Sequence, residues 1–403
     1  MGRLHSIDAM RTAARRRLPK FAFDFIDGGA LGETGLARNA SAFGDVRLTP
    51  RVLTGCTVRD PGVDLFGHRF SLPFGVAPIG LAGLAGPRVD EGLARAALEA
   101  GAPYVLSTAG TTAIEAIAAV APGSWFQLYV GRDQPITDDL LLRAEAAGVG
   151  ALVVTVDVPA PGKRVRDLDN GFGLPLKPTP AMAWDLMTHP AWSLDLAMNG
   201  APRFANLERY AERGAGAQSL AALMAAQSSA RLDWRLLAEI REAWKGPLIV
   251  KGVMHPLDAA RLAQLGVDGL VVSNHGGRQL DCTPAPIEAL PAVRAAVGPE
   301  LPVLVDGGIR SGEDIARALV LGADMVLLGR PFLFAAAARG ALRGGRELFV
   351  LLADELDRAM TQLGCADIAT LKALDVFKPE PTGQSAPSTR GTLRAVQERK
   401  IAP

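Results

Sequence analysis

The sequence predicts a (β/α)8 barrel, an α/β fold, with an N-terminal helical segment before it and one long insertion after the fourth strand. From about residue 73, short apolar runs rich in β-branched residues alternate with longer stretches of helical period, which is typical of a parallel sheet. The alternation gives eight units, and eight units in about 260 residues fit a closed barrel better than a doubly wound sheet.

The elements follow in chain order. The basic segment 1–20 has no continuous apolar run after its arginines, so it lacks the core of a secretory signal. We expect an amphipathic first helix there, although arginines 11–17 also imitate a mitochondrial presequence. The predicted strands are 74–77, 104–107, 125–129, 151–155, 248–251, 269–273, 302–306 and 325–329. Clear helical stretches follow at 90–100, 137–147, 256–265, 287–296 and 312–321.

Two segments interrupt this rhythm. Roughly 90 residues separate the fourth and fifth predicted strands, which is too long for a structureless loop. We therefore expect an insertion at about 171–232 that carries a function or its own helices. The barrel domain is predicted to span 1–376, and the stretch 377–403, rich in Pro, Ser, Thr and Gly, reads as a mobile tail or an arm over a neighbouring subunit.

Composition excludes several classes of function. The 43 Lys+Arg balance the 42 Asp+Glu, so nothing favours nucleic acid as a partner. The three cysteines, Cys56, Cys282 and Cys365, have no metal-ligand spacing, so we expect no metal site or disulfide framework and a reducing, cytoplasmic location. No run of about 18 apolar residues occurs, so a membrane-spanning helix is not expected.

Polar residues and glycines follow every predicted strand, at the end where a barrel of this kind carries its chemistry. They are Pro78, Ile79 and Gly80; Ser107 and Thr108; Gln127 and Tyr129; Thr155 and Asp157; Lys251; Ser273 and His275; Asp306, Gly307, Gly308 and Arg310; and Gly329 and Arg330. The glycines and arginines after the last two strands suit a phosphate, because backbone N–H groups can approach an anion there. A Gly-Gly turn alone would be weak evidence for a phosphate site. Its position after the seventh and eighth strands makes that evidence stronger.

Two cations and one histidine complete the predicted site. Lys251, at the end of an apolar run, is either a lysine whose charge reaches solvent or a cation that stabilises negative charge on a reduced ring. His275 lies just past a strand, and the guanidinium of Arg278, three residues later, suits a carboxylate. A base beside a carboxylate-binding group is what proton abstraction next to a carboxylic acid requires.

The segment Ser273-Asn-His-Gly-Gly-Arg-Gln-Leu-Asp281 resembles the signature of the FMN-dependent 2-hydroxy acid dehydrogenase and oxidase family. The similarity extends from Leu18-Pro19-Lys20 to about Val376. It implies FMN as the cofactor, with His275 as the base, Asp157 as its carboxylate partner and Lys251 beside the flavin ring. Substrate-binding positions implied by the resemblance are Arg278, Arg164, Tyr129, Phe25 and Ala109, with Tyr129 also catalytic. Cofactor-binding positions are Pro78, Ile79, Gly80, Ser107, Gln127, Thr155, Lys251, Ser273, Asp306, Gly307, Gly308, Arg310, Gly329 and Arg330.

Three positions bear on the place of this chain within the family. Phe25 stands where the family carries a tyrosine that binds the substrate carboxylate, so that contact is expected to be lost or replaced, at a cost of roughly 0.5 to 3 kcal/mol if nothing compensates. Ala109 replaces the tryptophan of glycolate-type oxidases, which should open the pocket to a larger side chain. Gly80 matches lactate- and mandelate-type dehydrogenases, for which oxygen is a poor acceptor.

The resemblance therefore implies oxidation of a lactate- or mandelate-like L-2-hydroxy acid to the 2-oxo acid, with electrons passed to a quinone or another acceptor. Alternatives are an oxidase that uses oxygen, an enzyme that acts on a modified peptide or amino-acid derivative, and a barrel that binds flavin without catalysis. Residues 181–200 resemble the insertion of membrane-associated members and can enter the lipid interface of the inner face of the cell membrane, or form a soluble lid. A homotetramer is implied as well.

Overall fold

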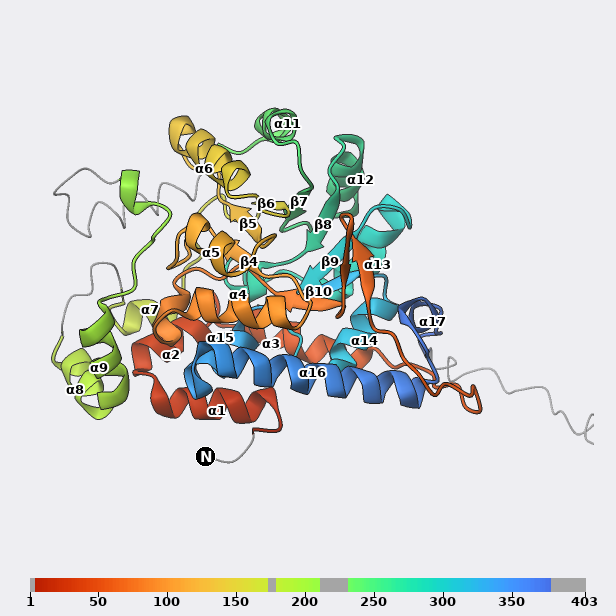
Figure 1. The fold of residues 1–403 in the computed structure, drawn as a ribbon, viewed down its shortest axis with the longest axis horizontal. Coiled ribbons are helices and arrows are strands. Elements are labelled where there is room, and N and C mark those ends of the chain that lie inside the picture. Colours follow the sequence, from red (N-terminus) through yellow and green to blue (C-terminus); the bar gives the residue numbers. More distant parts are fainter. Residues whose placement is uncertain (1–3, 173–178, 211–230, 378–403) are drawn as a thin grey trace, which may run out of the picture.

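The computed structural model describes residues 4–172, 179–210 and 231–377. Its centre is a closed parallel barrel of eight strands (Figure 1). The strands are β3 (Phe74–Val76), β4 (Val105–Ser107), β5 (Trp125–Leu128), β6 (Leu152–Thr155), β7 (Leu248–Lys251), β8 (Gly269–Val272), β9 (Val303–Asp306) and β10 (Met325–Leu328). They pair in the order β3-β10-β9-β8-β7-β6-β5-β4, and a parallel bridge between Val76 and Tyr104 closes the ring. The predicted fold class is confirmed, and each predicted strand end agrees within one residue.

Helices surround the barrel, as the period of the sequence indicates. They are α4 (Val89–Glu99), α5 (Ile114–Val120), α6 (Gln134–Ala146), α11 (Trp234–Ala243), α12 (Pro256–Gln264), α13 (Pro286–Val297), α14 (Gly312–Val320), α15 (Arg330–Arg339), α16 (Ala341–Leu363) and α17 (Ile368–Lys372). Several begin at a side-chain cap: Asp233 accepts from the backbone N–H of Leu236, and Ser311 accepts from that of Asp314.

Successive side chains of a strand point to opposite faces of the sheet, so the barrel has an outer and an inner apolar layer. Outward-facing residues pack against the helices, while a second buried cluster fills the barrel. A hairpin of β1 (Val63–Leu65) and β2 (His68–Phe70) covers the N-terminal end of the barrel, because the rings of Phe66 and Phe70 lie 5.5 and 5.9 Å from that of Trp125 at the start of β5. The opposite end, where the strands terminate, is left for the site.

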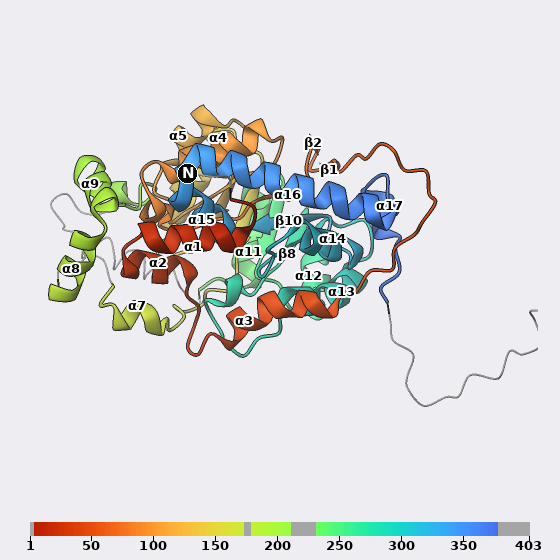
Figure 2. The ribbon, with the colours of Figure 1, turned by 90° about the horizontal axis from the view of Figure 1, so that it is seen from below.

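The N-terminal segment folds into α1 (Ile7–Arg17), α2 (Lys20–Asp27), α3 (Thr34–Ser41) and the 3-10 turn η1 (Ala42–Asp45). Helix α1 is amphipathic as expected, with Ile7, Met10 and Ala14 buried, and it packs along α15 (Figure 2). Pro19 separates α1 from α2, since its missing N–H cannot continue the first helix.

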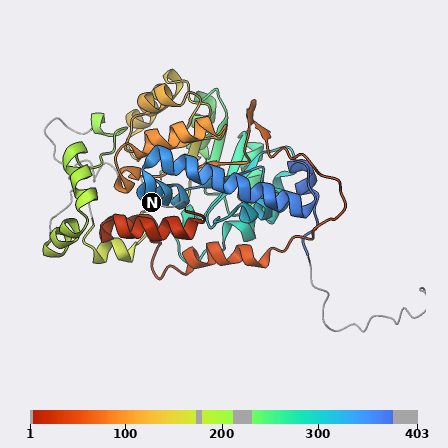
Figure 3. The same cartoon turned by 60° about the horizontal axis from the view of Figure 1, so that its bottom comes forward.

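Helix α7 (Val165–Asp169) precedes the predicted insertion. The described part of the insertion carries helices of its own, as predicted: α8 (Pro180–Thr188), α9 (Pro190–Asn199) and the 3-10 turn η3 (Glu208–Tyr210). Helices α8 and α9 project from one side of the barrel, beyond the ends of α1 and α2 (Figure 3). In the part of the chain that the structure describes, no helix has the length and apolar character needed to cross a membrane. Apart from Phe377, the predicted tail 377–403 lies outside the described residues.

Candidate active site

A cavity of about 640 Å³ opens at the C-terminal ends of the barrel strands. Most of the residues predicted for the site form its wall. These are Phe25, Pro78, Ile79, Gly80, Ala109, Tyr129, Arg164, Lys251, His275, Arg278, Asp306, Gly307, Gly308, Arg310, Gly329 and Arg330. Positions more than 300 residues apart in the chain, such as Phe25 and Arg330, thus meet around one space.

The other predicted residues are not part of this wall. Ser107, Gln127, Thr155 and Ser273 are buried, and Asp157 is partly exposed. The Ser107 hydroxyl donates to Gln127 Oε1 over 2.9 Å. Within the described ranges, Gln127 Nε2 and the Thr155 hydroxyl are buried and have no hydrogen-bond partner. Buried polar groups without partners are rare, so these two atoms are suited to a bound molecule.

His275 lies between a carboxylate and a phenol. Its Nδ1 is 3.0 Å from Asp157 Oδ1, and its Nε2 is 3.3 Å from the Tyr129 hydroxyl. Burial opposes the charge of Asp157, but the charges of His275 and Lys251 outweigh it and hold the pKa of Asp157 below its usual value. The side chain of His275 is presented by a left-handed turn, with φ of 59° at His275 and 64° at Gly276. A positive φ is uncommon outside glycine, and such strain gathers at functional sites.

Lys251 is an ammonium group held by two partners. Its Nζ donates to Ser273 Oγ over 2.7 Å and lies 3.2 Å from Asp306 Oδ2. Burial alone would favour the neutral amine, but the charges of Asp306 and Asp157 raise the pKa of Lys251 above its usual value. Ser273 Oγ also accepts from the backbone N–H of His275 over 3.0 Å. Ser273 therefore connects the cation to the histidine turn.

Two arginines flank Phe25. The guanidinium carbons of Arg278 and Arg164 lie 4.9 and 5.3 Å from the centre of the Phe25 ring. Arg278 Nη1 also donates to the carbonyls of Phe25 and Gly28, over 2.7 and 3.0 Å. Burial, together with repulsion from Arg164 and Arg330, lowers the pKa of Arg278 well below its usual value. Such crowding of cations favours an anion between them.

Phe25 has no hydroxyl group that could bind the substrate carboxylate, which is the contact that the sequence analysis expects to be lost or replaced. In place of a hydroxyl donor, the ring offers its face to two cations, an arrangement that stabilises each by about 0.5 to 2 kcal/mol. Arg164 is held in addition by Asp167, with Nε 2.8 Å from Oδ2.

The opposite side of the cavity suits a phosphate. Gly307 and Gly308 have φ of 92° and 91°, and Gly329 precedes the first turn of α15. A Cβ atom on Gly329 would meet nothing closer than 3.9 Å, so it would extend into open cavity space. Burial lowers the pKa of Arg310, and burial and repulsion from Arg310 lower that of Arg330 to about 10. An anion near these cations and the helix start would relieve both effects.

The sequence indicated only some of the apolar residues in the wall. Among the apolar residues that it did not indicate are Val158, Pro161, Leu168, Phe172 and Phe204. Phe172 packs against Phe25, with ring centres 5.2 Å apart. Val158 and Pro161 lie in the loop after β6, Leu168 lies in the short helix α7, and Phe172 and Phe204 lie in irregular segments, so no extended helical or strand period marks them in the sequence.

The fold and the cavity define a class: a (β/α)8-barrel enzyme with a His–carboxylate pair, a site for a phosphorylated cofactor and a site for an anionic substrate. The chain belongs to the FMN-dependent dehydrogenase family, whose model matches residues 14–377. It is 45% identical to an L-lactate dehydrogenase of Caulobacter vibrioides over 90% of this chain and 94% of the relative. It is 42% identical to an L-lactate dehydrogenase of Pectobacterium atrosepticum over the same shares of the two chains.

Solved structures agree with this family. The monotopic membrane protein (S)-mandelate dehydrogenase matches with a TM-score of 0.89 and 40% identity, over 93% of this chain and 100% of that one. A mandelate oxidase matches with a TM-score of 0.81 and 38% identity, over 93% and 98%. The predicted family is confirmed.

The residues present fit FMN, the cofactor of the family. Gln127 Nε2, the Thr155 hydroxyl and Asp306 Oδ1 are buried polar atoms without partners in the described parts of the chain, as groups that bind a ring and a ribityl chain would be. The cavity volume lies within the range of small-molecule cofactor sites. Glycines, a helix N-terminus and two arginines meet at the end where the phosphate is expected.

Proposed function

We propose that this protein oxidises an L-2-hydroxy acid to the 2-oxo acid, using FMN. The observation that carries the proposal is that one cavity holds the Asp157–His275 pair and two arginines suited to a carboxylate, at the strand ends. Arg278 and Arg164 bind the substrate carboxylate, which places the hydroxyl-bearing carbon near His275.

Each polar residue of the cavity then has a separate role in accepting the proton or stabilising a charge. His275 Nε2 accepts the proton of the substrate hydroxyl, and Asp157 stabilises the imidazolium that forms. Tyr129 remains a protonated donor near Nε2, since burial and the charge of Asp157 raise its pKa above the usual value. Lys251, kept charged, stabilises negative charge in the cavity. When bound, FMN would supply the acceptor for the two electrons of the oxidation.

The substrate class is a lactate- or mandelate-like acid. The small side chain of Ala109 and the apolar wall of Phe172 and Phe204 provide space for a side chain larger than hydrogen. Relatives named as L-lactate dehydrogenases and structures named for mandelate agree with this class.

The test is anaerobic bleaching of the bound flavin by L-lactate, (S)-mandelate, glycolate and a longer 2-hydroxy acid. We expect lactate or mandelate to reduce the flavin and glycolate to do so poorly. Flavin that stays oxidised with all four acids would overturn the proposal and favour the peptide-derivative alternative. Reoxidation of the reduced enzyme by a quinone analogue, faster than by air, would support a dehydrogenase over an oxidase.

We further propose that helices α8 and α9 contact the lipid interface of the cytoplasmic face of the membrane, where a quinone can accept the electrons. Trp184, Met187, Leu194 and Met198 are each 59% exposed or more, while Trp192 anchors the pair by donating to the carbonyl of Leu84 over 3.0 Å. Exposed apolar side chains on helices that lie beside the barrel suit interfacial insertion.

Sedimentation with phospholipid vesicles tests this surface. The FMN-loaded protein should bind the vesicles, and the double variant Trp184→Gln, Met198→Gln should lose binding while it still reduces its flavin with substrate. Equal binding of both proteins would contradict the assignment of the surface.

A further inference from the structure

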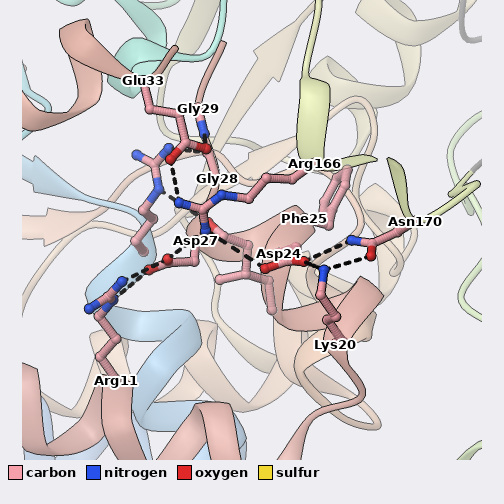
Figure 4. Close-up of polar contacts among 12 residues, drawn as sticks. Arg11, Lys20, Asp24, Phe25, Asp27, Gly28, Gly29, Glu33, Arg166 and Asn170 are labelled. Carbon is pink, nitrogen blue, oxygen red and sulfur yellow. Dashed lines mark hydrogen bonds and ion pairs between the residues drawn. The ribbon is translucent and has the colours of Figure 1, made fainter. Parts of the chain in front are cut away.

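A network of ion pairs lies behind the substrate-binding wall, between α1, α2 and α7 (Figure 4). Arg166 of α7 reaches Asp27 of α2 with Nη1 3.1 Å from Oδ2, lies 3.7 Å from Asp24 Oδ1, and pairs with Glu33. Arg11 of α1 binds Asp27 through two nitrogens, at 2.6 and 2.8 Å. None of these five side chains belongs to the cavity wall.

A second connection joins the same two helices one turn further along. Asn170, at the end of α7, donates to Asp24 Oδ2 over 2.8 Å, and Lys20 donates to Asn170 Oδ1 over 2.8 Å (Figure 4). Arg166 and Asn170 are four residues apart and share one face of α7. That face is bound to α2.

The opposite face of α7 lines the cavity. Arg164, the residue before the first turn of α7, together with Asp167 and Leu168, belongs to the wall. The guanidinium of Arg164 approaches Phe25, which α2 carries between Asp24 and Asp27. The contact between α2 and α7 thus sets where Arg164 lies relative to the ring.

The second substrate-binding arginine depends on the same end of α2. Helix C-termini leave carbonyls without intrahelical partners, and cations bind them. Arg278 donates to the carbonyls of Phe25 and Gly28, and Arg330 donates to those of Ile26 and Gly28 over 3.1 and 2.7 Å. A shift of the C-terminal turn of α2 would therefore move the guanidinium groups of Arg278 and Arg330.

The network stabilises the charge of Asp27. Burial opposes the ionisation of Asp27, whose side chain is 6% exposed, but hydrogen bonds and charges of Arg11 and Arg166 hold its pKa below the usual value. Glu33 couples the network to the turn itself, because its Oε1 accepts from the backbone N–H of Gly29 over 2.9 Å.

We propose that Arg166 is a positioning residue for the substrate carboxylate: by binding Asp27, Asp24 and Glu33, it fixes α7 against the C-terminal turn of α2 and so holds Arg164 and Arg278 in register around Phe25. The inference rests on the proposed function, because it assumes that these two arginines bind the carboxylate. Arg166 itself does not touch the cavity.

The test compares Arg166→Gln, Arg166→Lys and Arg59→Gln in the FMN-loaded protein. Arg59 is the matched control, because it binds Asp357 through two nitrogens at 2.7 and 2.9 Å and does not line the cavity. Binding of a 2-oxo acid and of the corresponding neutral 2-oxo amide is measured by the change in the flavin absorption spectrum. Thermal unfolding is recorded for each variant.

We expect Arg166→Gln to bind the acid about tenfold to a hundredfold more weakly and the amide as the wild type does, because a misplaced guanidinium affects only the carboxylate contact. Arg166→Lys should recover part of the affinity for the acid, since lysine keeps the positive charge but lacks the planar guanidinium that binds through several nitrogens. Arg59→Gln should bind both the acid and the amide with the affinity of the wild type. Unchanged acid binding in Arg166→Gln, or an equal loss for acid and amide, would overturn the proposal.

Two further outcomes separate this inference from the proposed function and from misfolding. If the wild-type protein bound no 2-oxo acid and no 2-hydroxy acid, the proposed function would fail first. If Arg166→Gln failed to fold, Glu33→Gln, which removes one of the partners of Arg166 and keeps the others, should show the same selective loss for the acid in weaker form. An unchanged ratio of acid to amide affinity in that variant would refute the positioning role.

Discussion

Asp157 and His275 form the central pair of the cavity, with Oδ1 3.0 Å from Nδ1, although 118 residues separate them in the chain. Asp157 follows β6, and His275 stands in the left-handed turn after β8. The ends of β6 and β8, on either side of β7 in the barrel, bring the two together, and the carboxylate leaves Nε2 directed toward Tyr129 and available to a substrate.

Replacement of His275 by alanine removes the proposed base. We expect the variant to bind FMN, because no cofactor contact is assigned to the imidazole, and to reduce its flavin with substrate at least about 10²-fold more slowly. Stopped-flow absorbance at the flavin band measures this rate. His68→Ala, in the exposed hairpin β1–β2, is the control and should reduce at the wild-type rate. Normal reduction in His275→Ala would contradict the assignment.

Asp157→Asn tests the partner of the base. The amide cannot stabilise an imidazolium by charge, so the rate of flavin reduction should fall by roughly 10²-fold, whereas the affinity for a 2-oxo acid should change little. The pKa of Asp157 lies below its usual value, so the carboxylate stays charged at neutral and mildly acidic pH. The defect should therefore be present throughout that range. A variant that reduced its flavin normally at pH 7 would show that the charge is dispensable.

The barrel was predictable because the strands are short apolar runs, most of them β-branched and most followed by a helix of regular period, so local pattern and final fold agree. The strand ends then indicated which polar residues would meet. The sequence could not indicate Phe172 and Phe204, which line the cavity from irregular segments. Nor could it indicate the pair of Arg166 with Asp27, because 139 residues separate them and only the packing of α7 on α2 brings them together.

Phe25→Tyr tests how the carboxylate site works without a tyrosine. The phenol adds a donor at the wall between Arg164 and Arg278, so KM for L-lactate should fall about three- to tenfold, the equivalent of about 1 kcal/mol. Binding of the 2-oxo acid should improve by a similar factor, and binding of its neutral amide should not. An equal gain for both ligands would mean that the hydroxyl acts on the pocket in general.

Asp27→Asn tests the stability that the ion pairs behind the wall contribute. Because hydrogen bonds and charges of Arg11 and Arg166 place the pKa of Asp27 in the folded protein below its usual value, the unfolded chain takes up the proton first as the pH falls. The carboxylate therefore stabilises the fold fully above its ordinary pKa of about 4, and this contribution disappears as the pH falls through the lower, folded value. At pH 7 the variant should lose about 1 to 3 kcal/mol of unfolding free energy.

Chemical denaturation of the FMN-loaded protein at pH 7, 5 and 4 should show the difference from wild type shrinking toward the lowest pH. Asp357→Asn, which breaks the more exposed pair with Arg59, is the control and should cost much less, because exposed ion pairs contribute little to stability. A difference for Asp27→Asn that stayed constant down to pH 4 would show that packing, rather than charge, holds α2 at this position.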